Sequence, residues 1–381
     1  MPRLLFLTTE YWSFESHKLG MAAAARDAGF DVTVAARGVP AQPPAGFSAI
    51  EFPWRRAGTT LGAALRFFPD VARVRRLLRD HPPAALHAID LRPGIVGAVA
   101  AFGSGIPVLI SINGLGFTFF ARTLPARLIQ WACGVILRRV VRTNRGQILV
   151  QNRDDAAVVE GALGVDPARV RLIRGSGVDP ALFTPQPIAH QPISKGHRFR
   201  FLILSRLLYM KGIQVAVEAH EILRTRGVES TLVIGGVPDS GNPSSIPQSV
   251  LDRWAKIPGV ELPGHVKEVR SVLAETDVVL HPALGGEGLP KALLEAAAAG
   301  RAMIATDVPG NREVVVPGET GLLVPPGDAV ALADAMQRAI DAPSDCAQWG
   351  AAARDKVVRE FSASLIRDQH AALYRDLAAH S

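Results

Sequence analysis

The sequence has few cysteines and no long apolar run, and each absence excludes classes of protein. The 381 residues include two cysteines, Cys133 and Cys346, which lie far apart without metal-ligand spacing. A disulfide framework and a zinc site are therefore not expected. No stretch has 18 uninterrupted apolar residues, and the run at residues 4–7 is too short for a signal-peptide core. A protein of the reducing cytoplasm is expected.

Two signatures of common ligand-binding sites are missing as well. There is no Asp-x-Asp segment, and the adjacent Asp154 and Asp155 are typical of a helix start. We therefore expect no bound metal. The first apolar run leads into residues 10–17 without a Gly-x-Gly loop, which argues against a nicotinamide or flavin. No cofactor is expected.

Negative charge is scarce in the first half of the chain. The net charge is +7, and residues 1–188 hold 22 Lys and Arg against 13 Asp and Glu, whereas the remainder holds 20 against 22. Such an excess suits nucleic acid, anionic lipid or an acidic substrate. The sequence lacks an aromatic-basic stacking platform and any recognised helix-turn-helix or finger pattern, so nucleic-acid binding is only a remote alternative.

The length and the apolar pattern predict two α/β domains. A chain of 381 residues is too long for one ordinary core. In the first half, apolar runs alternate with helix-like segments, as in a parallel sheet with covering helices. The strands expected there span residues 4–9, 32–36, 85–89, 107–112, 147–151 and 170–173.

A Pro-rich polar stretch at residues 184–196 is the expected linker. It divides the chain into a first lobe (1–188), a second lobe (189–365) and a final helix (366–381) that could return to the first lobe. The second lobe repeats the pattern, with expected strands at residues 199–204, 230–234 and 277–281. The expected fold class is α/β, with two Rossmann-like doubly wound lobes and a ligand-binding cleft between them.

Residues 285–295 combine a turn, a helix start and two carboxylates. Pro290 or Lys291 is expected as the first helical residue, because proline suits the first turn. The free N–H groups of that turn can bind phosphate or sugar oxygens. Glu287 presents a carboxylate just outside the helix, and Glu295 suits hydrogen bonds from a diol such as ribose. The alternative is a capped helix with two solvated glutamates.

Two cations, Arg206 and Lys211, follow the first expected strand of the second lobe. Arginine engages two phosphate oxygens in a fork, and lysine adds a mobile point charge. This pairing suits a diphosphate leaving group, which gains charge as the bond to it breaks. Two solvated surface cations are the alternative.

Together these segments resemble the retaining glycosyltransferases of family four, which have the GT-B fold. The resemblance rests on Arg206 with Lys211, on Glu287 and Glu295 separated by seven residues, and on residues 307–313 and 321–326. In the first lobe, the similar segments are residues 10–12, 16–18, 114–117, 151–152 and 175–179. They are similar to the subgroup that extends lipid-linked sugars for O-antigen, capsule or exopolysaccharide.

The resemblance implies a role for each donor-side residue. Arg206 and Lys211 would hold the donor diphosphate, and Glu295 would hold the ribose. Glu287 would hold the donor sugar together with the backbone amides of Gly288 and Leu289. All these roles agree with the chemistry of the side chains described above.

Three histidines and one asparagine need separate treatment. His17 and His87 approach the expected cleft, where each either contacts substrate or has a structural role. By resemblance, His265 would border the nucleotide base through its backbone. Many family members have a histidine where this sequence has Asn113, followed by Gly114, so the catalytic role of that histidine does not carry over. Asn113 and Gly114 are candidates for contact with the acceptor or the sugar.

The expected reaction is metal-independent transfer of a hexose or N-acetylhexosamine to a sugar hydroxyl, with the anomeric configuration retained. The donor would be a UDP-sugar in preference to a GDP-sugar and would bind the second lobe. The first lobe would bind the acceptor, a soluble or polyprenyl-diphosphate-linked glycan of a bacterial surface polysaccharide. A sugar-nucleotide epimerase of the same fold is the alternative.

A membrane-binding surface is expected at residues 117–145. Its apolar side chains are Phe117, Phe119, Phe120, Leu124, Leu128, Ile129 and Trp131. At about 100° per residue, the side chains of Arg127, Arg138, Arg142 and Arg145 fall within about 60° of one another. They would form a basic stripe beside an apolar surface, as binding to the anionic inner face of the cell membrane requires. Arg138, Arg139 and Arg142 are the residues expected to contact the membrane. The alternative is a core helix with solvated arginines.

Overall fold

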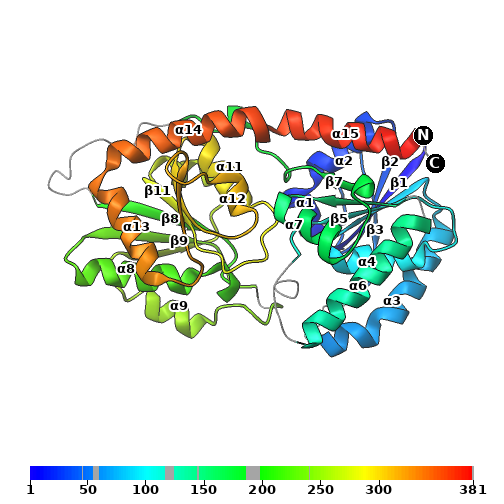
Figure 1. The fold of residues 1–381 in the computed structure, drawn as a ribbon, viewed down its shortest axis with the longest axis horizontal. Coiled ribbons are helices and arrows are strands. Elements are labelled where there is room, and N and C mark those ends of the chain that lie inside the picture. The colour runs from blue at the N-terminus through cyan, green and yellow to red at the C-terminus, as the bar shows by residue number, and fades with distance from the viewer. Residues whose placement is uncertain are drawn as a thin grey trace. The chain divides into compact units, whose positions relative to one another are not determined.

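The computed structural model describes residues 1–44, 46–54, 60–115, 124–143, 146–185, 198–239 and 241–379. The chain forms two compact units, the first made of Met1–Gly177 with Ala363–Ser381 and the second of Val178–Ser362. Each unit has one parallel sheet with helices on both faces (Figure 1). The expected α/β fold class with two doubly wound sheets is confirmed.

The sheet of the first unit has the strand order β3-β2-β1-β4-β5-β6-β7. Its strands are β1 (Arg3–Glu10), β2 (Asp31–Arg37), β3 (Ser48–Glu51), β4 (Ala85–Ile89), β5 (Val108–Ile112), β6 (Gln147–Val150) and β7 (Val170–Leu172). Alternate side chains of β1 enter two different cores: Leu5 and Leu7 pack on one face of the sheet, and Leu4 and Phe6 pack on the other. Burial on both faces explains why this strand reads as one continuous apolar run.

The helices of the first unit cover both of those faces. They are α1 (Tyr11–His17), α2 (Leu19–Asp27), α3 (Thr60–Asp80), α4 (Leu91–Ala100), α6 (Leu124–Thr143), α7 (Arg153–Ala157) and the carboxyl-terminal α15 (Ala363–Ala379). Helix α15 packs along α2 (Figure 1), where Arg367 Nε donates to Asp27 Oδ2 at 2.6 Å. Its buried Tyr374 belongs to the same core as Phe6. The end of the chain thus completes the first unit.

The sheet of the second unit has the order β10-β9-β8-β11-β12-β13. Its strands are β8 (Phe199–Leu204), β9 (Ser230–Gly235), β10 (Val260–Gly264), β11 (Val278–His281), β12 (Ala302–Thr306) and β13 (Gly321–Val324). Its helices are α8 (Ile213–Thr225), α9 (Gln248–Trp254), α10 (Val269–Ala274), α11 (Lys291–Ala298), α12 (Asn311–Val314), α13 (Ala329–Asp341) and α14 (Pro343–Phe361).

The second unit begins before the expected linker. Val178 and Phe183 lie in its core, and Arg354 donates hydrogen bonds to the carbonyls of Phe183 (2.8 Å) and Pro180 (3.3 Å). These contacts assign residues 178–185 to the second unit. The expected boundary at residue 188 lies outside the described residues.

Each sheet changes winding direction at one pair of strands. In the first unit these strands are β1 and β4, and in the second they are β8 and β11. Successive strands lie on opposite sides of such a pair, so the loops at its carboxyl ends diverge. Ligands of open α/β sheets bind at that edge.

Candidate active site

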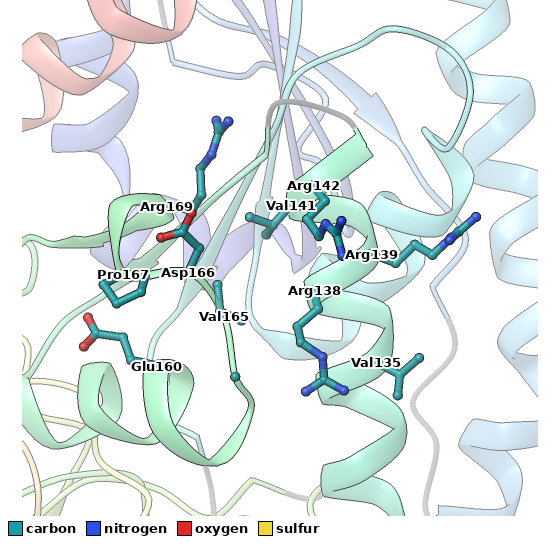
Figure 2. Close-up of a pocket in the computed structure, with 11 residues that line it drawn as sticks. Val135, Arg138, Arg139, Val141, Arg142, Glu160, Val165, Asp166, Pro167 and Arg169 are labelled. Atoms are coloured by element: carbon teal, nitrogen blue, oxygen red, sulfur yellow. The ribbon is translucent and has the colours of Figure 1, made fainter.

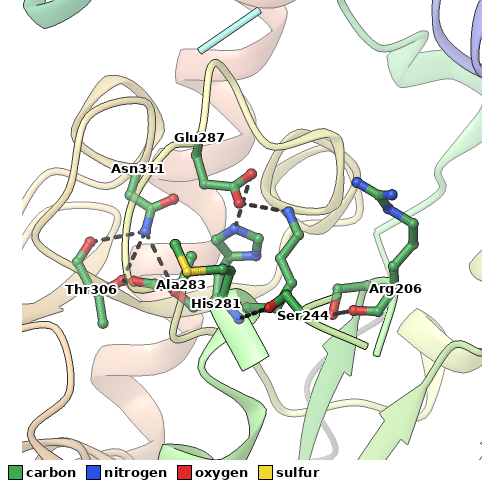
Figure 3. A network of polar contacts seen from close by, with 10 residues as sticks. Arg206, Ser244, His281, Ala283, Glu287, Thr306 and Asn311 are labelled. Atoms are coloured by element: carbon green, nitrogen blue, oxygen red, sulfur yellow. Dashed lines mark hydrogen bonds and ion pairs between the residues drawn. The ribbon is translucent and has the colours of Figure 1, made fainter. Parts of the chain in front are cut away.

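Lys211 and Glu287 meet beside the winding-reversal point of the second sheet. Lys211 ends the short 3-10 turn Tyr209–Lys211 after β8, and Glu287 lies in the loop between β11 and α11. Lys211 Nζ donates to Glu287 Oε1 at 2.6 Å, and both side chains are largely buried (Figure 3). The turn ends at Gly212 with φ 67°, where a Cβ would lie 1.8 Å from the carbonyl oxygen of Pro282. A glycine is therefore needed to bring the two loops together.

Arg206 forms the other ion pair of this edge. It follows β8 directly, and its Nη1 donates to Asp239 Oδ2 at 2.9 Å. The Arg206 side chain is 47% exposed, whereas the Asp239 side chain is 16% exposed. Solvent-borne phosphate oxygens can therefore reach the guanidinium. The sequence reasoning did not single out Asp239, which lies in the loop after β9.

His281 is a further member of the cluster that the sequence reasoning missed. It ends β11, and its Nε2 lies 4.0 Å from Glu287 Oε2 (Figure 3). Burial lowers the pKa of His281 to about 4, so the ring is neutral at physiological pH. Within the described residues, Nε2 has no hydrogen-bond partner. His281 could have been found from its position in the sequence, because it ends a buried strand just before the loop that contains Glu287.

The two glutamates of residues 285–295 have different electrostatic environments. Burial acts to raise the pKa of Glu287, but the positive charges of Lys211 and Arg206 and the hydrogen bond from Lys211 hold it below its usual value. Burial raises the pKa of Glu295, which lies 3.6 Å from Lys291 Nζ, one turn away on α11. Glu287 is thus ionised beside the cations Lys211 and Arg206. Glu295 lies on α11, where its carboxyl group can accept hydrogen bonds.

The loop after β12 packs against the loop between β11 and α11, which contains Glu287. Gly310 has φ 79°, and a Cβ there would lie 2.3 Å from the carbonyl oxygen of Gly288. Asn311 is buried and donates to the carbonyl oxygen of Thr306 at 2.9 Å (Figure 3). Helix α11 begins at Lys291, after Pro290, so the backbone around Gly288 and Leu289 lies just before a helix start.

Two of the three histidines singled out from the sequence lie at the surface. His265 follows β10 and is exposed, and the backbone of the preceding Gly264 accepts a hydrogen bond from the N–H of Gly236 at 2.8 Å. His17 ends α1 and is also exposed. Neither observation assigns a ligand contact.

Of the two roles left open for His87, its surroundings favour the structural one. His87 is fully buried on β4, where its ring contacts Phe6. Its Nδ1 shares a hydrogen bond with the Tyr374 hydroxyl at 2.9 Å, and its Nε2 shares one with the Ser111 hydroxyl at 2.6 Å. With both ring nitrogens occupied and no exposed surface, His87 joins α15 to the sheet.

Asn113 and Gly114 follow β5 at the carboxyl edge of the first sheet. Asn113 Nδ2 donates to Asp90 Oδ1 at 2.7 Å, and Asn113 Oδ1 accepts from Gln151 Nε2 at 2.6 Å. These two bonds fix the orientation of the carboxamide. Gly114 has φ 119°, a conformation that side chains rarely adopt.

Helix α6 carries the arginines of the expected membrane surface. Arg138, Arg139 and Arg142 line a cavity of about 930 Å³ between α6 and residues 160–169, together with Arg169 (Figure 2). Arg138 donates to the carbonyl of Leu163, and Arg139 lies over the ring of Phe102.

The same helix exposes apolar side chains. Leu124 is 80% exposed, Leu128 65% and Trp131 64%. Phe117, Phe119, Phe120 and Arg145 lie outside the described residues. Among the described helices, none is long and apolar enough to cross a membrane.

Comparisons with known proteins match both units. Residues 198–342 match the family described as glycosyl transferases group 1, and residues 15–175 match the family described as glycosyl transferase 4-like domain. The solved structure of HepE from Anabaena with UDP and glucose superimposes with a TM-score of 0.75, covering 98% of this chain and 99% of that one. The two sequences are 18% identical, so this likeness concerns the fold.

Two curated relatives extend the comparison. The amylovoran biosynthesis glycosyltransferase AmsK of Erwinia amylovora is 32% identical over 57% of this chain. The alignment covers 51% of AmsK, so the chain spans about half the length of this relative. The capsular polysaccharide biosynthesis glycosyltransferase CapM of Staphylococcus aureus is 24% identical over 80% of each chain.

Fold and matches together define the class: the chain has the GT-B fold and is built from two glycosyl transferase domains. Its second unit contains a domain of the glycosyl transferases group 1, and its first unit contains a glycosyl transferase 4-like domain. The family resemblance inferred from residues 206–211 and 287–295 is confirmed.

Proposed function

We propose that the protein transfers a hexose or N-acetylhexosamine, with retention, from a UDP-sugar to a glycan hydroxyl during synthesis of a bacterial surface polysaccharide. The observation that carries this proposal is the cluster of Arg206, Lys211 and Glu287 at the winding-reversal point of the second sheet. The solved HepE structure contains UDP, and AmsK and CapM are named for polysaccharide synthesis, which supports the donor and the pathway class.

The donor diphosphate becomes a partner of both cations. Arg206 turns from Asp239 to two phosphate oxygens, and Lys211 uses its three N–H groups to bind phosphate while it keeps Glu287. As the bond between the anomeric carbon and the diphosphate oxygen breaks, the negative charge grows on that oxygen. The cations stabilise this charge without a metal.

The new glycosidic bond forms on the face that the diphosphate leaves. The acceptor hydroxyl oxygen bonds to the anomeric carbon, and its proton passes to the departing diphosphate, so no separate base is needed. Glu287 and the amides near Gly288 and Leu289 hold the donor sugar. Glu295 accepts hydrogen bonds from the ribose hydroxyls, for which its ionised form is the stronger acceptor.

A thermal-shift panel of UDP- and GDP-sugars tests the donor assignment, because a ligand that binds only the folded state raises Tm. We expect stabilisation by UDP and by one or a few UDP-sugars. No shift with any nucleotide sugar would contradict the proposal. The epimerase alternative is separated by incubating the enzyme with the donor alone, since an epimerase would yield isomerised nucleotide sugar.

We also propose that the first unit binds the anionic inner face of the membrane, where a polyprenyl-diphosphate-linked acceptor would reside. At about 100° per residue, the exposed Leu124, Leu128 and Trp131 fall on one face of α6. Arg139 and Arg142 follow them toward the end of the helix and line the cavity of about 930 Å³ (Figure 2). The apolar side chains could contact the acyl chains of a bilayer, and the arginines that follow them could contact the lipid phosphate groups.

A further inference from the structure

Polar side chains also gather at the winding-reversal point of the first sheet. Asp90 directly follows β4, Asn113 follows β5 and Gln151 follows β6. Lys18 follows β1 after the two turns of α1. Strands β1, β4, β5 and β6 are neighbours in the sheet, so all four residues belong to its carboxyl edge.

Asp90 has a backbone conformation that side chains avoid. Its φ is 74° and its ψ is 158°, in a region that is essentially restricted to glycine. In the described part of the chain, no other non-glycine residue has a positive φ. Its carboxylate does not cap α4, the helix that follows it. Strain of this kind persists at functional sites, where the side chain is needed in spite of its cost.

The hydrogen bonds of Asp90 and Asn113 leave ligand-binding capacity. Asp90 Oδ1 accepts from Asn113 Nδ2, whose other N–H has no bond within the described residues. Asp90 Oδ2 likewise has no side-chain partner there. Asp90 and Asn113 are both half-buried. A carboxylate oxygen and an amide N–H are therefore available together.

Lys18 is a buried cation that lacks an acceptor. It is 7% exposed, and its ammonium makes no hydrogen bond or ion pair with any described residue. Burial lowers the pKa of Lys18, whereas the charge of Asp90 raises it. The other titratable groups that face it are His87 and His370, both kept neutral because burial lowers their pKa values. Because no described residue accepts a hydrogen bond from the Lys18 ammonium, an oxygen of a bound ligand can do so.

We propose that Asp90, Asn113 and Lys18 bind neighbouring hydroxyls of an uncharged sugar ring of the acceptor. Asp90 Oδ2 accepts from one hydroxyl, and Asn113 and Lys18 donate to hydroxyl oxygens. The set holds one charge of each sign, so it suits neutral hydroxyls better than a carboxylate or phosphate, which would face Asp90. This assignment rests on the proposed glycosyltransferase function and adds residues that bind the acceptor.

The test uses saturation-transfer NMR on the full chain with UDP bound. The probes are methyl glycosides of glucose, galactose and mannose, compared with methyl glucuronide. Wild type is expected to give signals from at least one neutral glycoside and weaker signals from the glucuronide. Asp90→Gly, Asp90→Ala and Lys18→Met should each lose the glycoside signals and keep UDP binding. Asp80→Ala, at the exposed end of α3, is the control with the same change in charge and should retain them.

Thermal unfolding of the two Asp90 variants separates a binding role from a structural one. Both lose the carboxylate and its bond to Asn113, but only alanine retains a Cβ at the strained position. We expect Asp90→Gly to have a Tm about 2–5 °C above that of Asp90→Ala, the reverse of the usual order at an unstrained position.

Several results would overturn this inference. They are glycoside signals that persist in both Asp90 variants, an alanine variant as stable as the glycine variant, or a UDP-bound wild type that gives no glycoside signal. Failure of the wild type to bind UDP would instead contradict the proposed function. The two failures are therefore distinguishable.

Discussion

The two sheets place similar groups at corresponding points, but they differ in how those groups are paired. In each sheet a lysine follows the first strand and a carboxylate follows the fourth: Lys18 and Asp90 in the first unit, Lys211 and Glu287 in the second. Lys211 and Glu287 are bonded at 2.6 Å. Lys18 makes no ion pair within the described residues, although the charge of Asp90 influences its pKa.

This difference indicates two kinds of ligand. The second unit holds two cations, Lys211 and Arg206, each paired with a carboxylate, Glu287 or Asp239. A diphosphate can take the place of Asp239 on Arg206 and add to the bonds of Lys211, because it brings the negative charge that both cations bind. The corresponding edge of the first unit has one cation and one carboxylate, which suits hydroxyl groups. The predictions below test whether the two edges are specialised in this way.

The largest effect is expected from removing the cations of the second unit. Arg206→Ala and Lys211→Ala should each lower turnover at saturating donor by about a hundredfold or more, because such charge stabilisation contributes roughly 3 kcal/mol in the transition state. Lys256→Ala, which removes an exposed lysine after α9, is the matched control. If both variants keep turnover within about threefold of wild type, the diphosphate assignment is wrong.

The next effect concerns the positive surface of the first unit. Arg138 is bonded to the carbonyl of Leu163, so its replacement would also disturb the fold. We therefore predict that the double variant Arg139→Gln and Arg142→Gln weakens low-salt cosedimentation with anionic liposomes about 30-fold, at about 1 kcal/mol for each arginine. High salt should release the wild type.

The control for this experiment is the double variant Arg76→Gln and Arg79→Gln on α3, which makes the same change of charge on an exposed helix face. It should sediment like the wild type. Equal sedimentation of the two double variants, or none for the wild type at low salt, would remove the membrane proposal and leave the enzyme assignment intact.

The positions of Arg206, Glu287 and Glu295 could be predicted from sequence because each lies in a short loop after a strongly apolar strand or in the helix that follows it. Arg206 follows β8, and Glu287 and Glu295 flank the start of α11, so local spacing alone brings them to one edge. The pair of Lys211 with Glu287 could be anticipated only from the topology, because 76 residues separate them.

The role of His87 could not be decided from sequence for a related reason. Its partner Tyr374 lies 287 residues away on α15, and a local pattern does not reveal that a distant helix covers a strand. Strand β3 was also missed, because Ser48–Glu51 is a short edge strand with a half-buried, non-alternating pattern. The strain at Asp90 left no trace in the sequence, because nothing in the local pattern marks a non-glycine residue with positive φ.

A smaller effect should separate the two glutamates of the second unit. Glu295→Gln should weaken the binding of free UDP about tenfold, because a charge-assisted hydrogen bond to ribose contributes about 1.5 kcal/mol or more. Glu287→Gln should leave UDP affinity nearly unchanged and lower turnover, since its carboxylate faces Lys211 and the donor sugar. Isothermal titration with UDP and steady-state kinetics provide the two measurements. Equal losses of UDP affinity in both variants would contradict this division.

The remaining prediction is a matched acid sensitivity of the two units. Burial lowers the pKa of His281 in the second unit and of His370 in the first to about 4, below the usual 6.5. As pH falls below about 6.5, each histidine binds a proton in the unfolded chain but stays neutral in the folded chain until about pH 4. The free energy of unfolding therefore falls across this pH window. Each histidine should therefore cost about 2 kcal/mol between pH 7 and pH 5.

Replacement of either histidine should reduce this loss by the same amount. We expect His281→Asn and His370→Asn to show a smaller drop in denaturation free energy from pH 7 to pH 5 than the wild type, measured by urea unfolding at each pH. The exposed His265→Asn is the control and should behave like the wild type, because its surroundings in solvent change little on folding. If one variant alone shows the full wild-type drop, the histidine that it replaces is charged in the folded wild type. The two units would then not share a buried neutral histidine.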